Sequence, residues 1–317
     1  MPIDSGPDGP GRVPETPAAP DRQARPDVPD RPEAPGTRAP RAGPGVPDAT
    51  AFRQEQIAEH LRYQRLADAT CQAAARETWA RAAPDLRVAW EEHKEKYPER
   101  SRATPLAQPD GGWAAEGGRR LTPEQNAEAT KACADLRDEA DRVILPAMRR
   151  VEAASPDGKL AGLEHMLKHE DRLKEKIADY LRAPGVTVRG AIDKVPDAVR
   201  FTLKYEPIRY AEGVLADVGL LKAAGFELLK LKNLWHADQY KGVNSQWRRP
   251  DTGLRFEMQF HTPESLEAKE LTHEAYERIR SKTASSAEER KLEDFQQRAN
   301  ALLATPPGTD RIKDFPE

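Results

Sequence analysis

Three polar side chains alternate with apolar ones in the segment FEMQFHT, residues 256–262. The polar members are Glu257, Gln259 and His261. Successive side chains of a β-strand point to opposite faces of a sheet, so these three would share one face and line a pocket. There, Glu257 could bind a metal ion or accept a proton from an attacking hydroxyl group. The alternative is a polar outer face of an antiparallel sheet.

A second carboxylate, Asp197, stands directly before a segment of alternating apolar and polar residues, 198–205, which also carries Arg200. A carboxylate at the end of a strand can hold Mg²⁺, because this ion prefers hard oxygen ligands. The alternative is an aspartate that stabilises a turn after Pro196.

Cationic side chains recur at a spacing of four residues, at Lys168, Arg172 and Lys176. In a helix this spacing places all three on one face, where they could grip a triphosphate. Glutamates are interleaved with them, so a solvated basic face is the alternative.

Tyr240, Lys241 and Asn244 begin another strand-like segment. A tyrosine at the start of a strand can stack on a nucleotide base, and Lys241 can contact a phosphate. The alternative for the aromatic residues of this region, Trp235 and Tyr240, is a place in the core or at its rim.

The elements that must position these residues are indicated by periodicity and by turn-forming residues. Helices are expected over residues 50–82, 84–97, 122–154, 160–181, 209–224, 263–282 and 285–303. Strands are expected over residues 198–205, 227–234, 240–248 and 254–261, the last two as a hairpin. This order predicts an α+β fold, a mixed β-sheet flanked by helices, with a helical N-terminal arm.

Three finer expectations concern the N-terminal half. Pro146 should kink its helix. Residues 98–120 are rich in Pro, Gly and charge, which is typical of a linker. One face of the first helix should carry its large apolar residues, Ile57, Leu61, Leu66 and Trp79.

Composition narrows the class of protein. Residues 1–48 hold 13 of the 28 prolines and almost no large apolar side chain, which predicts a disordered Pro-rich tail. The net charge of −3 gives no global basic field for bulk binding of nucleic acid. No apolar run reaches the length of a membrane span, and the N-terminus lacks the pattern of a secretory signal. We therefore expect action in the cytoplasm, and export by a secretion system that needs no signal peptide stays open.

The order and spacing of these clusters resemble the RelA/SpoT-like nucleotidyltransferase (synthetase) domain over residues 159–282. The most specific segments are PDAVRFTL at 196–203 and FEMQFHTPES at 256–265. The resemblance is to a toxin-associated and phage-associated actinobacterial branch. It implies a synthetase domain at residues 156–304. Around it would lie a tail at 1–48, a helical region of unknown role at 49–155 and a C-terminal tail at 305–317.

The activity that the resemblance implies is an ATP-dependent nucleotide 3′-pyrophosphokinase, acting as a growth-inhibiting toxin or effector whose partner would be an antitoxin or immunity protein. Asp197 and Glu257 would be catalytic and would hold Mg²⁺. The residues that bind the nucleotides would be Lys168, Arg172, Lys176, Arg200, Tyr240, Lys241, Asn244, Gln259 and His261. The wall of the pocket would be closed by the helix that carries Glu264, Glu267, Lys269 and His273.

The sequence departs from the family pattern at two places. Met166 stands where an arginine is usual, and Gly242-Val243-Asn244 follow the tyrosine where Ser-Leu-His is usual. The acceptor therefore stays open between an adenine nucleotide, a guanine nucleotide and tRNA. The sequence does not indicate the oligomeric state. Two other functions also stay open. One is a toxin that pyrophosphorylates the 3′ end of tRNA, and the other is a catalytically inert synthetase-like module that binds a partner.

Overall fold

A computed structural model describes residues 49–98, 105–281 and 284–316, and the tail expected at 1–48 lies outside these ranges. The helices are α1 (Ala49–Lys96), α2 (Pro123–Glu139), α3 (Leu145–Ala154), α4 (Glu170–Leu181), α5 (Val188–Ile192), α6 (Tyr210–Ala223), α7 (Pro263–Arg280) and α8 (Ser286–Ala301). The strands are β1 (Leu106–Ala107), β2 (Trp113–Ala115), β3 (Arg119–Leu121), β4 (Lys159–Ala161), β5 (Arg200–Lys204), β6 (Glu227–Asn233), β7 (Val243–Arg248) and β8 (Arg255–His261). By its internal contacts the chain divides after Arg53, and all that follows concerns the unit Gln54–Glu317.

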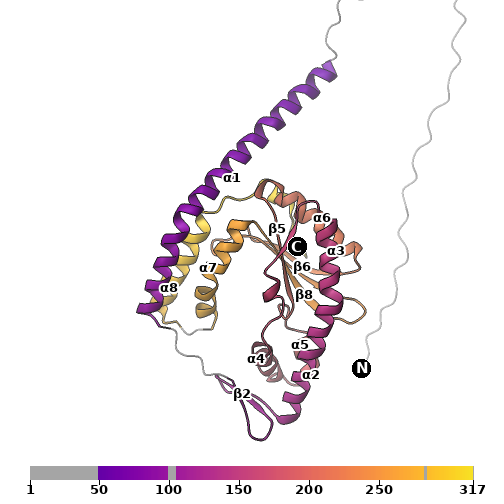
Figure 1. Cartoon of the computed structure of the whole chain (residues 1–317), viewed down its shortest axis with the longest axis vertical. Coiled ribbons are helices and arrows are strands. Elements are labelled where there is room, and N and C mark those ends of the chain that lie inside the picture. The colour runs from indigo at the N-terminus through magenta and orange to yellow at the C-terminus, as the bar shows by residue number, and fades with distance from the viewer. Residues whose placement is uncertain (1–48, 99–104, 282–283, 317) are drawn as a thin grey trace, which may run out of the picture. The chain divides into compact units, whose positions relative to one another are not determined.

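Five strands form the main sheet in the order β4-β5-β8-β7-β6 (Figure 1). Strands β5 and β8 are parallel, and the other neighbouring pairs are antiparallel. The sheet is therefore mixed, and helices flank it, so the predicted α+β class is confirmed. The strand that carries Glu257, Gln259 and His261 lies at the centre of the sheet.

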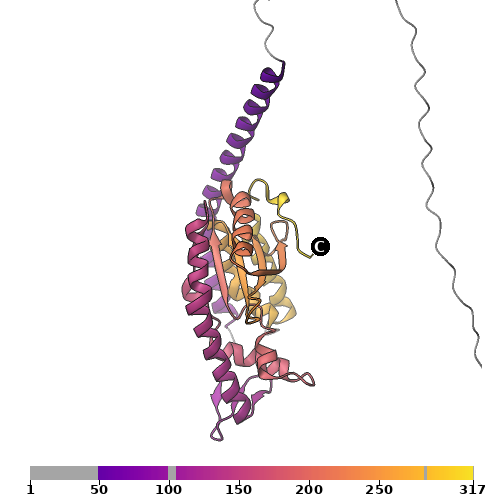
Figure 2. The ribbon, with the colours of Figure 1, turned by 90° about the vertical axis from the view of Figure 1, so that its right-hand side faces the viewer.

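One face of the sheet is apolar, and helices α3 and α6 cover it. The strand residues that point to this face are Phe201, Leu203, Val243, Trp247, Phe256, Met258 and Phe260, all of them at most 1% exposed. They pack with Met148 and Val151 of α3 and with Val214 and Leu221 of α6. Figure 2 shows α2 and α3 running along one side of the sheet. Because the apolar side chains occupy this face, the polar residues between them must point to the other.

A second core holds α1 against α7 and α8. Its largest members are Trp79 and Trp90 of α1 and Phe295 of α8. The rings of Trp90 and Phe295 are stacked with 5.3 Å between their centroids. In Figure 1, α7 lies beside α8, with the sheet on its other side. A third core joins the small sheet β1–β3 to helices α2, α4 and α5 around Trp113 and Ile177.

Two expectations about helix α1 were wrong. It continues without interruption through Pro84 to Lys96, where two helices were predicted. Pro84 costs the helix a hydrogen bond, roughly 3 kcal/mol, but the second core packs the helix on both sides of it. The predicted apolar face is also wrong, because Ile57, Leu61 and Leu66 are 45% to 63% exposed while Trp79 is buried.

Three other boundaries differ from the predictions. Helix α4 begins at Glu170, so residues 160–169 form β4 and a short 3₁₀ turn instead of helix. Strand β7 begins at Val243, three residues after Tyr240. The predicted linker at 98–120 contains β1, β2 and the start of β3. Before Pro146, where a kink was predicted, the long helix passes through a π-helical segment, Ala140–Ile144.

The C-terminal residues 305–316 lie along the edge strand β6. Phe315 forms a bridge with Leu231, with backbone hydrogen bonds of 2.6 and 2.9 Å. Asp314 pairs with Lys232 at 2.6 Å, and Ile312 is buried in the main core. This segment covers a sheet edge that would otherwise present unpaired backbone groups. Within the described part of the chain, no helix is long and apolar enough to cross a membrane.

Candidate functional site

The polar face of the main sheet, opposite α3 and α6, collects the predicted strand residues. Register places Glu257 of β8 between Arg200 of β5 and Gln246 of β7. The next row is Thr202, Gln259 and Asn244, and the last joins Lys204 to His261. Gln259 is only 4% exposed and His261 is fully buried. Burial of these two side chains is inconsistent with a solvated outer face, which was the alternative for this strand.

A row of alternating charges crosses the start of β5 and β8. Lys168 Nζ lies 2.5 Å from Asp197 Oδ2, and Arg200 Nη2 lies 3.3 Å from the same oxygen. Arg200 Nε then donates to Glu257 Oε2 at 2.7 Å. We name Lys168, Asp197, Arg200 and Glu257 the charge row. One guanidinium thus holds both predicted catalytic carboxylates in the same place.

Burial and charge act in opposite directions within the charge row. Burial disfavours the ionised form of Asp197, but the hydrogen bond from Lys168 and the charge of Arg200 outweigh it, so the pKa of Asp197 lies below its ordinary value. Burial likewise disfavours the charge of Arg200, but Glu257 and Asp197 raise the pKa of this guanidinium. Both shifts favour the ionised forms, the carboxylate of Asp197 and the guanidinium of Arg200.

Gln259 has one amide atom engaged and one without a partner. Its Nε2 donates to Glu257 Oε1 at 3.1 Å. Its Oε1 is buried and accepts no hydrogen bond from any residue that the structure describes. A buried polar atom without a partner costs about 1–3 kcal/mol. A ligand hydroxyl or amine that donates to this oxygen, directly beside Glu257, would remove that cost.

Tyr240 belongs to a second polar network at the other end of the face. Its hydroxyl donates to Asn244 Oδ1 at 2.6 Å and lies 2.8 Å from His261 Nε2. His261 Nδ1 lies 2.9 Å from the Ser265 hydroxyl. Since both ring nitrogens have partners, the imidazole is fixed in place. Burial, and secondarily the charge of Lys269, lower the pKa of His261 to about 3.

Gly242 explains one departure from the family pattern. Its φ is +155°, and a Cβ at this position would stand 2.9 Å from Cε1 of His261 and 3.0 Å from the carbonyl oxygen of Phe260. A serine could not occupy this position beside the histidine without a shift of the strand. The glycine and the buried His261 are therefore matched to each other.

Helix α7 presents some of its predicted wall residues to the site and others away from it. Thr262 caps the helix, and Pro263 follows as its first residue, so the strand β8 leads directly into it. Lys269 is half-buried, and its nearest charges include Arg200 and Glu257. The charges near His273 also include Lys269 and Arg200. Sequence reasoning missed Ser265, which orients His261 and is signalled by its place in the segment FEMQFHTPES.

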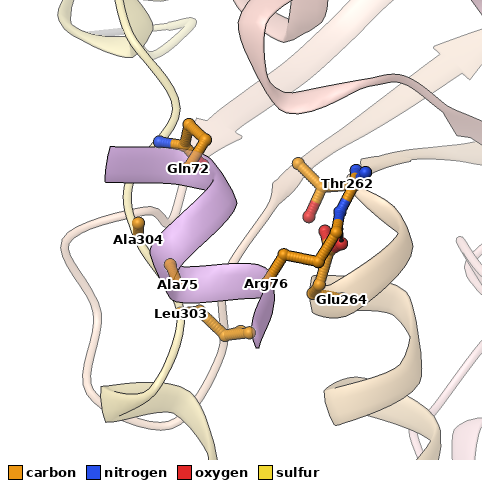
Figure 3. Close-up of a pocket in the computed structure, with 7 residues that line it drawn as sticks. All are labelled: Gln72, Ala75, Arg76, Thr262, Glu264, Leu303 and Ala304. Atoms are coloured by element: carbon orange, nitrogen blue, oxygen red, sulfur yellow. Dashed lines mark hydrogen bonds and ion pairs between the residues drawn. The ribbon is translucent and has the colours of Figure 1, made fainter. Parts of the chain in front are cut away.

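The other two residues named on this helix, Glu264 and Glu267, contact α1. Arg76 Nε lies 2.6 Å from Glu264 Oε1, and Figure 3 shows this contact across a small pocket between α1 and the start of α7. Glu267 accepts a hydrogen bond from the Trp79 indole at 2.7 Å and also pairs with Arg87. The pocket in Figure 3 is therefore on the back of α7 and separate from the polar face.

The remaining predicted cations are placed less centrally. Lys168 precedes α4 and does not share a helix face with Arg172 and Lys176 as predicted. Arg172 is exposed and pairs with Glu175 at 3.4 Å. Lys176 is half-buried, and its neighbouring charges include Lys168 and Asp197. Lys241 donates to the carbonyl oxygen of Trp235 at 2.9 Å, so its ammonium is tied to the loop before β7.

The donor set fits a magnesium ion that is shared with a substrate. Among the described residues, no three His, Cys, Asp or Glu side chains gather into a metal cluster. Asp197 and Glu257 supply two carboxylates on one guanidinium. Mg²⁺ is commonly held by one or two carboxylates together with substrate phosphates and water. The residues present would suit that mode of binding and not an all-protein cage.

Comparison with known proteins finds similarity among solved structures. The small alarmone synthetase 1 from Bacillus subtilis bound to its product pppGpp is 13% identical, with a TM-score of 0.40, covering 59% of this chain and 92% of that chain. A complex between the Type VI effector Tas1 and its immunity protein matches at 18% identity and a TM-score of 0.38, covering 56% and 94%. A GTP pyrophosphokinase family protein from Streptococcus pneumoniae matches at 14% identity and a TM-score of 0.38, covering 57% and 90%. No protein-family model and no curated protein matches the chain.

Proposed function

We propose that the chain is an ATP-dependent pyrophosphokinase that acts on the 3′-hydroxyl of a nucleotide. In this reaction the 3′-oxygen of the acceptor attacks the β-phosphorus of ATP. The bond between that phosphorus and the oxygen bridging to the α-phosphate breaks, and AMP leaves. The proton of the acceptor hydroxyl passes to Glu257. Positioning and charge stabilisation supply most of the rate in transfers of this kind.

The observation that carries the proposal is the hydrogen-bonded pair of Glu257 and Gln259, in which the amide oxygen of Gln259 stays unsatisfied. Glu257 Oε1 and Gln259 Nε2 are 3.1 Å apart on the polar face, and Gln259 Oε1 has no partner among the described residues. A ribose carries adjacent hydroxyl groups. One hydroxyl can donate to Gln259 while its neighbour gives its proton to Glu257, so the pair suits a ribose acceptor.

The charge row supports binding of the phosphate donor. Lys168 and Arg200 are the cations within it, and charge-assisted hydrogen bonds from such groups are the usual means of holding phosphates. Asp197 and Glu257 would hold Mg²⁺, which would neutralise charge that develops on the phosphate oxygens. Tyr240 would stack on the acceptor base. Its hydroxyl is anchored by Asn244 and His261, which fixes the orientation of the ring.

The proposal is tested by incubating the full chain with γ-labelled ATP, Mg²⁺ and, separately, AMP, ADP, GDP, GTP and bulk tRNA. We expect the label to move to a nucleotide. Glu257→Gln should lower transfer roughly 10²-fold to 10⁴-fold, because the proton acceptor is lost. The matched control is Glu227→Gln, which changes an exposed carboxylate of the edge strand β6 that pairs with Arg248, two strands away from Glu257. It should keep full activity.

The outcomes distinguish the open alternatives. If label appears on tRNA alone, the acceptor is an RNA 3′ end and the proposal of a nucleotide acceptor is wrong. If the folded chain binds ATP but transfers label to no acceptor, the chain is an inert binding module and not an enzyme. The toxin or effector role, with an antitoxin or immunity protein as partner, rests on the sequence resemblance. It requires that induced expression of the active chain stops growth and that Glu257→Gln does not.

A further inference from the structure

Helix α7 has a polar face that it does not use for packing against α1. At 100° per residue, five side chains lie within about 40° of Lys269. We name them the site stripe: Ser265, Lys269, His273, Tyr276 and Arg280. The opposite face carries Glu267 and Arg278. Glu267 binds Trp79 and Arg87 of α1, and the Arg278 guanidinium lies 5.3 Å from the centre of the Trp90 ring.

The site stripe begins on the floor of the candidate site. Ser265 lies 2.9 Å from His261 of the central strand. One turn further along α7, Lys269 is half-buried, and the charges that act on its pKa include Arg200 and Glu257 of the charge row. Among the described residues, the Lys269 ammonium has no hydrogen-bond or ion-pair partner within the usual distances. The stripe then reaches solvent at Tyr276, which is 47% exposed.

An ammonium in this position lacks compensation. Burial lowers the pKa of Lys269, the charge of Arg200 lowers it further, and Glu257 and Glu270 only partly oppose them. Glu257 already accepts hydrogen bonds from Arg200 and Gln259. A half-buried cation that has lost water without gaining a counter-ion is destabilising, and an anionic ligand would supply what it lacks.

Lys176 of α4 stands in the same situation at the other end of the charge row. It is half-buried, and burial and the charges of Arg280 and Lys168 lower its pKa, while Asp197 opposes them. It too has no ion-pair partner in the described part of the chain. The charge row contains as many basic as acidic side chains, and Lys176 and Lys269 add two further basic side chains that have no ion-pair partner among the described residues.

We propose that Lys269 is a further phosphate-binding residue. It and Lys176 hold the two ends of a polyphosphate chain that lies along the charge row. The inference rests on the proposed function in taking this chain to be the triphosphate of ATP. It adds that the ligand must contain enough linked phosphates to reach both Lys176 on α4 and Lys269 on α7. A triphosphate should therefore bind much more tightly than a monophosphate. Helix α7 then serves as a second phosphate-binding wall that faces α4.

The test uses the full chain, with inorganic tripolyphosphate as the probe and orthophosphate for comparison. Binding is measured by calorimetry without metal and at fixed low ionic strength. We expect Lys269→Met to weaken tripolyphosphate binding roughly tenfold to a hundredfold, the usual effect of losing one hydrogen bond to a charged group. Lys269→Arg should restore most of it. The matched control is Lys222→Met, which removes an exposed lysine of α6, on the other side of the sheet.

Equal affinity for tripolyphosphate in Lys269→Met and Lys222→Met would overturn the inference, and so would equal affinity of the unaltered chain for tripolyphosphate and orthophosphate. Melting temperatures of all variants establish that they are folded, and Lys269→Arg decides the matter if Lys269→Met is not. Failure of the proposed function has a different signature. The unaltered chain would then bind tripolyphosphate through Lys269 but transfer label to no acceptor.

Discussion

His261 is a fully buried histidine whose ring nitrogens both have hydrogen-bond partners. Its pKa is about 3 in the folded chain, against 6.5 for a free histidine. Below pH 6.5, His261 therefore binds a proton in the unfolded chain but not in the folded chain. Stability is lost as the pH falls from 6.5 towards 3. Between pH 7.5 and pH 5 this one residue should lower the free energy of unfolding by about 2 kcal/mol.

The measurement is urea unfolding at both pH values for the unaltered chain and for His261→Asn. The variant should lose less stability on acidification by about the amount given, whatever its stability at pH 7.5. His60→Asn, at an exposed position of α1, provides the control and should show the same loss as the unaltered chain. Identical pH dependence in all three proteins would mean that His261 is not held neutral by burial.

At the scale of elements, α1 supports the helix that forms one wall of the candidate site. Trp79 is 2% exposed, and its indole donates to Glu267 of α7. Trp79→Ala should lower the free energy of unfolding by about 3–5 kcal/mol, because it leaves a cavity and removes the hydrogen-bond donor of one carboxylate oxygen of Glu267. Tyr63→Ala removes a 63%-exposed ring from the same helix and should change stability by less than about 0.5 kcal/mol. Similar losses in both variants, measured by urea unfolding, would contradict the role given to α1.

The strands of the main sheet could be predicted because their side chains alternate. In β8 each second residue is apolar, and the structure buries that set against α3 and α6. Residues 160–169 could not be predicted in this way. Leu160, Leu163 and Leu167 have helical spacing. Gly162 between them, however, has a φ of +62° and ends any helix there.

The site residues on the strands were predictable from the same alternation of side chains. The contacts between residues of different elements were not. Glu257, Gln259 and His261 follow from the alternation of one segment. The contact of Asp197 with Lys168 joins residues that are 29 positions apart and depends on how the loop before α4 crosses the sheet. The direction of Glu264 towards Arg76 depends on α1, which lies 188 positions away in sequence. Local pattern carries no information about such contacts, and only tertiary packing sets them.

At the scale of the whole molecule, the three apolar cores are built from residues between Trp79 and Ile312. We propose that residues 156–304 form the synthetase unit and that the preceding region, 49–155, braces it. A chain that lacks residues 1–48 should therefore keep its melting temperature and its transfer activity. A chain that lacks residues 305–317 should melt at a lower temperature, because it loses Ile312 from the core and the bridge of Phe315 to Leu231. The reverse result in thermal unfolding would contradict this division.

The charge row also affects how ligands enter the site. Lys168 and Arg200 are paired with Asp197 and Glu257, so the cations and the carboxylates of the charge row engage each other. A polyphosphate that takes over the two cations releases the carboxylates, and a divalent ion that takes over the carboxylates releases the cations. Each ligand would thus free the groups that bind the other. By thermodynamic linkage, the metal ion would raise the affinity for polyphosphate by the same factor as polyphosphate raises the affinity for the metal ion. Under the proposed function, we therefore expect nucleotide and metal to bind cooperatively, as one complex, and either of them to bind weakly alone.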